Sequence, residues 1–197
     1  MKADGNPTNV GFSLFNMTGN LVNIIGVLMA KPLAERFGKK WVFTIGLAGT
    51  AVFQALFFTL NPADVGLMFL FTTLISLSYG PTIPLLWAMI ADTADYAEWK
   101  NNRRATGFVY AGIIFALKAG LGLGGALAGW ILAAYGYEVA TARTPEVLGG
   151  IRLMASFFSS IPFALGALCM LFYPITKALN IQMSGELAAR HQPFEDP

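Results

Sequence analysis

A continuous apolar stretch with a single charge near its middle constrains this chain more than any other feature. Residues 105–137 contain no acidic or basic residue except Lys118. A helix needs about 20 mostly apolar residues to cross a bilayer, so this stretch is long enough to span a membrane. A lysine at the centre of such a helix costs about 2.5–3.5 kcal/mol to insert, and it normally faces a partner or a water-filled path. Snorkelling to the surface is the alternative, but the depth of Lys118 favours a functional role.

Four further apolar segments predict an all-α, polytopic membrane helix bundle. Only 12% of the residues are charged, against about 25% in ordinary soluble domains. The five spans are expected at about residues 10–30, 41–60, 65–91, 106–135 and 153–175. Residues 1–178 then form the transmembrane bundle, and residues 179–197 form a cytoplasmic tail.

The distribution of Lys and Arg between the short loops predicts the orientation of the chain. Nine basic residues fall on one side, at Lys31, Arg36, Lys39, Lys40, Lys100, Arg103, Arg104, Lys177 and Arg190. Three fall on the other side, at Lys2, Arg143 and Arg152. The first side is therefore expected to be cytoplasmic, with the N-terminus outside. An odd number of spans, an outside start and no secretory signal in residues 1–9 lead us to expect a fragment of a longer protein.

Composition argues against several other classes of protein. The basic residues lie in short clusters between apolar runs and form no continuous stripe, so we expect no nucleic-acid partner. The chain has one cysteine, Cys169, and one histidine, His191. A disulfide framework or a cysteine- or histidine-based metal site is therefore not expected.

Three short motifs carry a resemblance to a known family. The first is A-D-T-A-D-Y-A-E-W-K at residues 91–100, followed by R-R-A-T-G at 103–107. The second is F-A-L-K-A-G at 115–120, with the glycine-rich run after it, and the third is R-F-G-K-K at 36–40. From about residue 10 to residue 178 the chain resembles the glycoside–pentoside–hexuronide:cation symporters, the melibiose-permease-like branch of the major facilitator superfamily.

This resemblance implies helices 8–12 of a twelve-helix transporter in a bacterial-type inner membrane, with a cytoplasmic C-terminus. The implied activity is symport of a glycoside or pentoside sugar with a cation, sodium or proton, and no enzymatic reaction or other cofactor. The implied partner is a missing N-terminal half, which carries the cation-binding carboxylates, so the chain alone is expected to be inactive. Lys118 matches the lysine that lies beside those carboxylates in the central cavity, where it would couple cation and sugar binding. Its apolar neighbours Ile113 and Ile114 leave the particular sugar open.

Charged residues around the third predicted loop form a candidate gate. Asp92, Asp95 and Glu98 are spaced by three, which places them within reach of one helical face. They lie at a helix C-terminus, where the dipole disfavours negative charge and calls for cations. Arg103 and Arg104 follow directly. The resemblance implies a cytoplasmic ionic lock closed by arginines of the N-terminal half, whereas a solvated basic loop is the alternative.

Prolines interrupt the third predicted span at residues 79–84. Such breaks remove backbone donors and are tolerated in membranes only where protein or a water-lined cavity satisfies the freed carbonyls. Tyr79, Trp87 and Tyr110 are therefore candidate sugar contacts, since an aromatic ring can stack on a sugar face. Packing between helices explains Tyr79 and Trp87 equally well.

Two other classes of protein remain open beside the transporter. The first is a stand-alone membrane scaffold or assembly subunit that pairs with another protein. The small-residue pairs Gly120/Gly124 and Gly125/Gly129 favour close helix packing and do not distinguish these classes. A membrane-embedded transferase would need paired carboxylates near a surface. Asp92 and Asp95 fit that pattern only superficially, because no histidine or metal-binding cluster accompanies them.

Overall fold

The computed structural model describes residues 7–61, 64–103, 105–137 and 144–191. The helices in chain order are α1 (Pro7–Phe37), α2 (Lys39–Phe57), α3 (Val65–Tyr79), α4 (Thr82–Asn101), α5 (Thr106–Ala134), α6 (Pro145–Leu153), α7 (Ser159–Leu171) and α8 (Lys177–His191). A π-helical turn, Met154–Phe158, joins α6 to α7 without a break. The prediction of an all-α membrane bundle is confirmed.

Five helical segments are long and apolar enough to span a membrane: Gly11–Phe37, Lys39–Phe57, Val65–Asn101, Thr106–Ala134 and Pro145–Leu171. The fifth begins earlier than the expected residue 153. The reason is local, because the Thr144 side chain accepts a hydrogen bond from the Val147 backbone N–H and a proline follows at the first helical position. Both are strong helix-start features.

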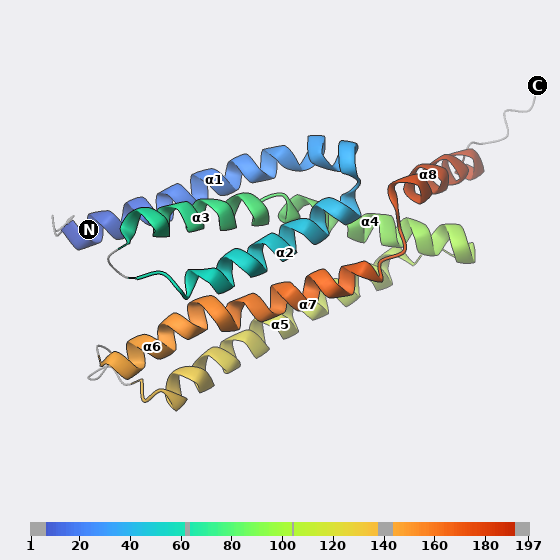
Figure 1. Cartoon of the computed structure of the whole chain (residues 1–197). Helices are drawn as coiled ribbons and strands as arrows, with labels where there is room; N and C mark the ends of the chain where they lie inside the picture. The colour runs from blue at the N-terminus through green and yellow to red at the C-terminus, as the bar shows by residue number, and fades with distance from the viewer. Residues whose placement is uncertain (1–6, 62–63, 104, 138–143, 192–197) are drawn as a thin grey trace, which may run out of the picture.

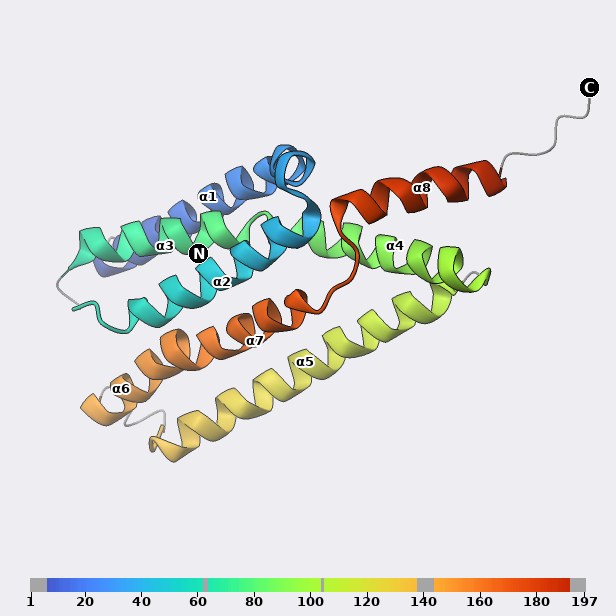
Figure 2. The same cartoon turned by 45° about the vertical axis from the view of Figure 1, so that its right-hand side comes forward.

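The helices pack as a bundle from which α5 diverges (Figures 1 and 2). Helix α1 lies along α3, and α2 packs on one side against α3 and on the other against α7. Helix α5 makes its main contacts with α4, from which it emerges, and with α6 at its far end. A cluster of buried apolar residues, Ala30, Phe43, Leu85 and Met89, lies where α1 turns into α2 and meets α4.

Cations from other elements cap the C-terminal ends of four helices. Each donates hydrogen bonds to carbonyl oxygens of the last turn or just beyond it: Lys177 to Glu35 of α1, Arg152 to Phe58 and Leu60 after α2, Arg190 to Trp99 of α4, and Lys40 to Leu171 and Tyr173 at the end of α7. A positive charge is favourable at a helix C-terminus, where the last carbonyls lack intrahelical partners.

The third span is interrupted at Gly80 and Pro81, between α3 and α4. The Thr82 hydroxyl donates a 2.6 Å hydrogen bond to the Tyr79 carbonyl, which the break would otherwise leave unpaired. Pro84 lies in the first turn of α4, where a backbone donor has no intrahelical acceptor. The expected interruption is therefore present, and Pro81 contributes more to it than Pro84.

Gly80 allows the break to lie directly against α1. A Cβ atom at Gly80 would lie 2.7 Å from the Asn23 carbonyl oxygen and 2.8 Å from the Gly26 Cα atom. We therefore expect Gly80→Ala to lower the free energy of unfolding by about 1–3 kcal/mol through overpacking. The matched control is Gly66→Ala, where an added Cβ meets nothing within 4 Å. Thermal unfolding in detergent measures the difference, and equal melting temperatures for both variants would contradict this packing.

Candidate functional site

Lys118 lies near the middle of α5 and is exposed. No residue of this 29-residue helix is buried. Within the described ranges, Lys118 forms no salt bridge. The described part of the bundle thus holds an ammonium at mid-depth of an apolar helix without a counter-ion.

The glycines of α5 share this open environment. A Cβ atom added at Gly120, Gly122, Gly124, Gly125 or Gly129 would meet no other atom of the described chain within 4 Å. The expected close packing of the glycine pairs against another helix is therefore not found among the described residues. No described helix therefore covers the glycines that follow Lys118 in α5.

Asp92 pairs with Lys39 at the end of the bundle that carries the basic loop. The Lys39 Nζ atom lies 2.7 Å from each Asp92 carboxylate oxygen. The Asp92 side chain is only 12% exposed and the Lys39 side chain 35%. Short distances to both oxygens make this a charge-assisted bond, stronger than one between neutral groups. It ties the first turn of α2 to the middle of α4.

Tyr173 extends the polar cluster around Asp92. Its hydroxyl lies 3.2 Å from the Met89 carbonyl, to which it donates. Burial raises the pKa of Tyr173 to about 12; a hydrogen bond from Thr93 opposes this rise and the charge of Asp92 adds to it. The phenol therefore keeps its proton at physiological pH and remains a donor.

A cavity of about 420 Å³ lies beside the ion pair, between α1, α4 and α8. Lys39 and Asp92 form part of its wall, with Lys31 and Glu35 of α1. The Asn180 side chain of α8 also lines it, and its Nδ2 atom is buried without a hydrogen-bond partner. The charged end of the bundle is thus hollow and partly polar.

The other predicted gate residues are less tightly held. Asp95 and Arg103 are exposed, and neither forms a salt bridge with another described residue. Glu98 is half-buried near the end of α4. Arg104 lies outside the described residues. The structure therefore brings Asp92 to Lys39 and leaves Asp95 at the surface one turn further on.

Helix α8 docks beside these residues and was not foreseen as a helix. Its side chains Met183 and Leu187 are buried. The Trp99 indole N–H donates a 2.6 Å hydrogen bond to Glu186, and Arg190 donates to the Trp99 carbonyl at 3.3 Å. The C-terminal segment is therefore fixed to the same end of α4 that carries the acidic residues.

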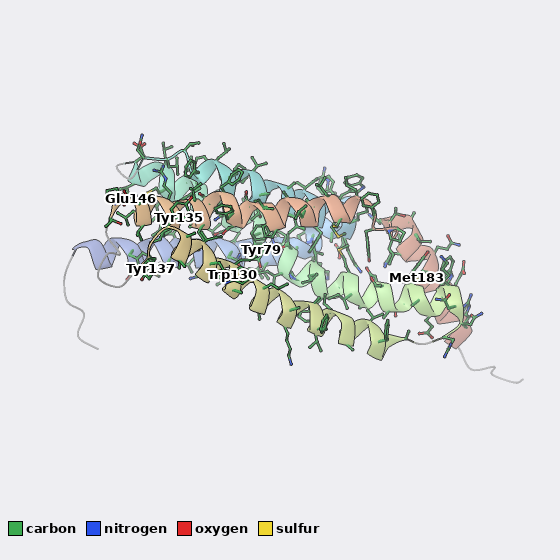
Figure 3. All side chains as sticks on the ribbon, turned by 90° about the horizontal axis from the view of Figure 1, so that it is seen from below. Tyr79, Trp130, Tyr135, Tyr137, Glu146 and Met183 are labelled. Carbon is green, nitrogen blue, oxygen red and sulfur yellow. The ribbon has the colours of Figure 1, made fainter. Side chains whose placement is uncertain are left out.

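The three candidate sugar contacts do not form a cluster. Tyr79, which lies near the middle of the molecule in Figure 3, packs edge-on against Phe163 of α7 with ring centroids 5.7 Å apart. Trp87 on α4 is exposed, and Tyr110 on α5 is half-buried. None of the three forms a ring contact with another of them. Packing between helices thus accounts for the position of Tyr79, whereas the Trp87 ring is uncovered.

Comparison with known proteins places the chain in a family. Residues 5–177 match the family model described as MFS/sugar transport protein. The chain is 37% identical to the inner membrane symporter YicJ of Escherichia coli over 165 residues, 83% of this chain and 34% of that protein. It is 32% identical to the isoprimeverose transporter of Lactiplantibacillus pentosus over 87% of this chain and 36% of that protein.

A glucuronide carrier protein homolog of Escherichia coli is 32% identical over 93% of the chain and 42% of that protein. The chain thus spans between a third and somewhat over two fifths of the length of these relatives. No solved structure matches it. The family match covers nearly the whole chain and agrees with the five apolar spans, so the chain is a multi-pass membrane protein that belongs to the MFS/sugar transport protein family.

Proposed function

We propose that this chain is the C-terminal part of a secondary transporter that carries a glycoside- or pentoside-type sugar together with a cation, sodium or proton. Relatives that are named as symporters or sugar carriers support the sugar and the coupling. The share of those relatives that the chain covers supports its role as one part of a larger protein.

The observation that carries this proposal is the position of Lys118. Its ammonium lies at mid-depth on a helix with no buried residue, and no described helix covers the glycines that follow it. A charge at that depth needs a counter-ion or water. In the proposed transporter the N-terminal half covers this face of α5 and brings carboxylates to Lys118, which lines the central cavity. Loss of a cation from those carboxylates would strengthen their attraction to Lys118, and this exchange would couple the cation to the sugar.

The acidic end of α4 is the proposed gate. Asp92 is already neutralised by Lys39 within the chain. Asp95 is exposed and is available to an arginine of the N-terminal half, while Glu98, Arg103 and Arg104 complete the charged end of the gate. In this scheme the cytoplasmic end closes when the second half docks against α4. It opens when those ion pairs break.

The sugar is proposed to bind near the break between α3 and α4. The exposed Trp87 ring would stack on an apolar sugar face, and the Tyr79 and Tyr110 hydroxyls are the further proposed contacts. The Trp87 ring is the most available of the three for such stacking, since Phe163 already covers Tyr79.

Uptake by proteoliposomes tests the proposed function. The full-length transporter that contains this chain is reconstituted, and the initial rate for labelled xylosides and galactosides is measured with an imposed sodium or proton gradient. We expect uptake of at least one glycoside that requires one of the two gradients, and none by residues 1–197 alone. Uptake that ignores both gradients would contradict symport. Absence of uptake for every sugar, by a protein that is folded and correctly inserted, would favour a scaffold.

A further inference from the structure

A second cavity, of about 490 Å³, opens between α1, α2 and the break that separates α3 from α4. We call it the α1–α2 groove. Phe37 and Trp41 line it at the membrane-surface end, and Ile45 and Leu77 line its walls. These four side chains are all exposed, so the groove is open along its length. Ser78 and the indole N–H of Trp41 are the polar side-chain groups among its lining residues.

Backbone forms the floor of the groove. A Cβ atom at Gly46 would lie 2.7 Å from the Thr82 methyl group and 2.8 Å from the Ser78 carbonyl oxygen. Helix α2 therefore approaches the break closely at Gly46. The preceding residue, Ile45, stays 66% exposed. The groove is therefore apolar and open to the exterior between α1, α2 and the break.

Charge at the α1–α2 turn is unbalanced. Lys31 lies 3.9 Å from Glu35, and Lys39 lies 2.7 Å from Asp92. The other two cations of the turn, at positions 36 and 40, form no salt bridge with any residue that the structure describes. Two positive charges therefore remain without an acidic partner at this membrane surface.

Each unbalanced cation lies close to an aromatic residue that lines the groove, although neither cation lines the groove itself. The Arg36 guanidinium carbon lies 5.3 Å from the centre of the Phe37 ring, and the Lys40 Nζ atom lies 5.9 Å from the centre of the Trp41 ring. Lys40 also donates to two backbone carbonyls at the end of α7, where the partial negative charge of the helix terminus offsets only part of its positive charge. An apolar groove with two aromatic rings in its lining and a cation close to each ring matches a molecule with an anionic head and an apolar tail.

We propose that the α1–α2 groove binds an anionic phospholipid, with one acyl chain along Ile45 and Leu77 and the phosphate beside Arg36 and Lys40. Ile45 is six residues after Lys39 in α2. With a rise of 1.5 Å per residue, it lies about 9 Å deeper in the membrane than Lys39. Aromatic side chains at headgroup level and basic residues at an anionic surface both favour this arrangement. The lipid site does not depend on what the transporter carries.

Native mass spectrometry tests the proposal on the full chain released from nanodiscs that contain phosphatidylglycerol and phosphatidylcholine with the same acyl chains. Ile45→Trp fills the groove from α2, and Leu77→Trp fills it from the opposite wall. Val52→Trp is the matched control, because Val52 is 54% exposed on the same face of α2, seven residues further on, and outside the groove. Arg36→Gln removes one headgroup contact. Size-exclusion chromatography and helicity by circular dichroism verify the fold of each variant.

We expect the wild-type chain and Val52→Trp to retain phosphatidylglycerol in preference to phosphatidylcholine. Arg36→Gln should lower that preference about five-fold, since a basic residue near an anionic surface contributes about 1 kcal/mol. A folded Ile45→Trp or Leu77→Trp variant should retain less of both lipids. Equal retention of the two lipids by the wild type would overturn the proposed headgroup. Retention by both groove variants equal to that of Val52→Trp would overturn the groove.

Discussion

Lys118→Ala should lower cation-driven sugar uptake by the full-length transporter about 10- to 100-fold, because a hydrogen bond to a charged group contributes about 1.5–3 kcal/mol. We expect the variant to lose the coupling between sugar uptake and the cation gradient. Without the ammonium, carboxylates of the second half would no longer exchange a cation for Lys118. The measurement is the initial rate of labelled sugar uptake at a fixed inward gradient of the coupling cation.

Two variants separate this effect from damage to the helix. Lys118→Arg keeps the charge and should keep more coupled uptake than Lys118→Ala. Leu121→Ala shortens an exposed side chain one turn further along α5 and should leave uptake near wild type. Sugar exchange across the membrane without a gradient should survive Lys118→Ala better than gradient-driven uptake. Coupled uptake at the wild-type rate in Lys118→Ala would remove Lys118 from the mechanism.

Lys39→Met should destabilise the bundle by about 1–3 kcal/mol, because it leaves the Asp92 carboxylate in a mostly buried position without a partner. Removal of one member of a fully buried pair costs about 3–5 kcal/mol. The smaller figure applies here since the Lys39 side chain is 35% exposed and water can reach its site. The loss is measured as a lower midpoint in thermal or denaturant unfolding in detergent.

The double variant Lys39→Met with Asp92→Asn should recover part of that loss, because no charge then remains buried. Lys31→Met is the matched control. Its side chain is 85% exposed and lies 3.9 Å from Glu35, so the change should stay within about 1 kcal/mol. Equal effects of Lys39→Met and Lys31→Met would contradict a structural role for the Lys39–Asp92 pair.

Asp92→Asn alone also tests the proposed gate in the full-length transporter. It should slow turnover more than it weakens sugar binding, because the gate closes in each transport cycle but does not touch the sugar. Sugar affinity measured beside the maximal uptake rate gives the comparison. A variant with normal turnover and weak sugar binding would place Asp92 in the sugar site instead.

Sequence alone predicted the features that depend on nearby residues. Apolar length identified the five spans, and the two prolines in residues 79–84 identified the break in the third. Lys118 could be identified because it is the one charged residue in the apolar stretch 105–137. Each of these signals lies within about 30 residues of sequence and follows from the cost of polar groups in a membrane.

Contacts between distant segments were not predicted. Lys39 is 53 residues from Asp92, and its position in a basic loop suggested membrane orientation and the family resemblance but no ion pair. Helix α8 was missed because its buried stripe is narrow, limited to Met183 and Leu187. A start signal was nevertheless present, since the Thr176 hydroxyl oxygen accepts a hydrogen bond from the Leu179 backbone N–H. Threonine is a frequent N-cap, and the spacing of four between Met183 and Leu187 places both on one helical face. Together these two features indicate a short amphipathic helix.

The cations that cap helix C-termini give the basic loops a second role. Lys40, Lys177 and Arg190 belong to the side with nine basic residues, yet each is bonded to a carbonyl oxygen of a helix end. Helices α1, α4 and α7 all end at that side of the bundle (Figure 1). These three side chains therefore have two roles. They contribute to the charge asymmetry that directs membrane insertion, and they form bonds that hold the ends of the folded helices. Moving Lys40 or Lys177 to invert the insertion of this chain would therefore also remove bonds that hold its helix ends.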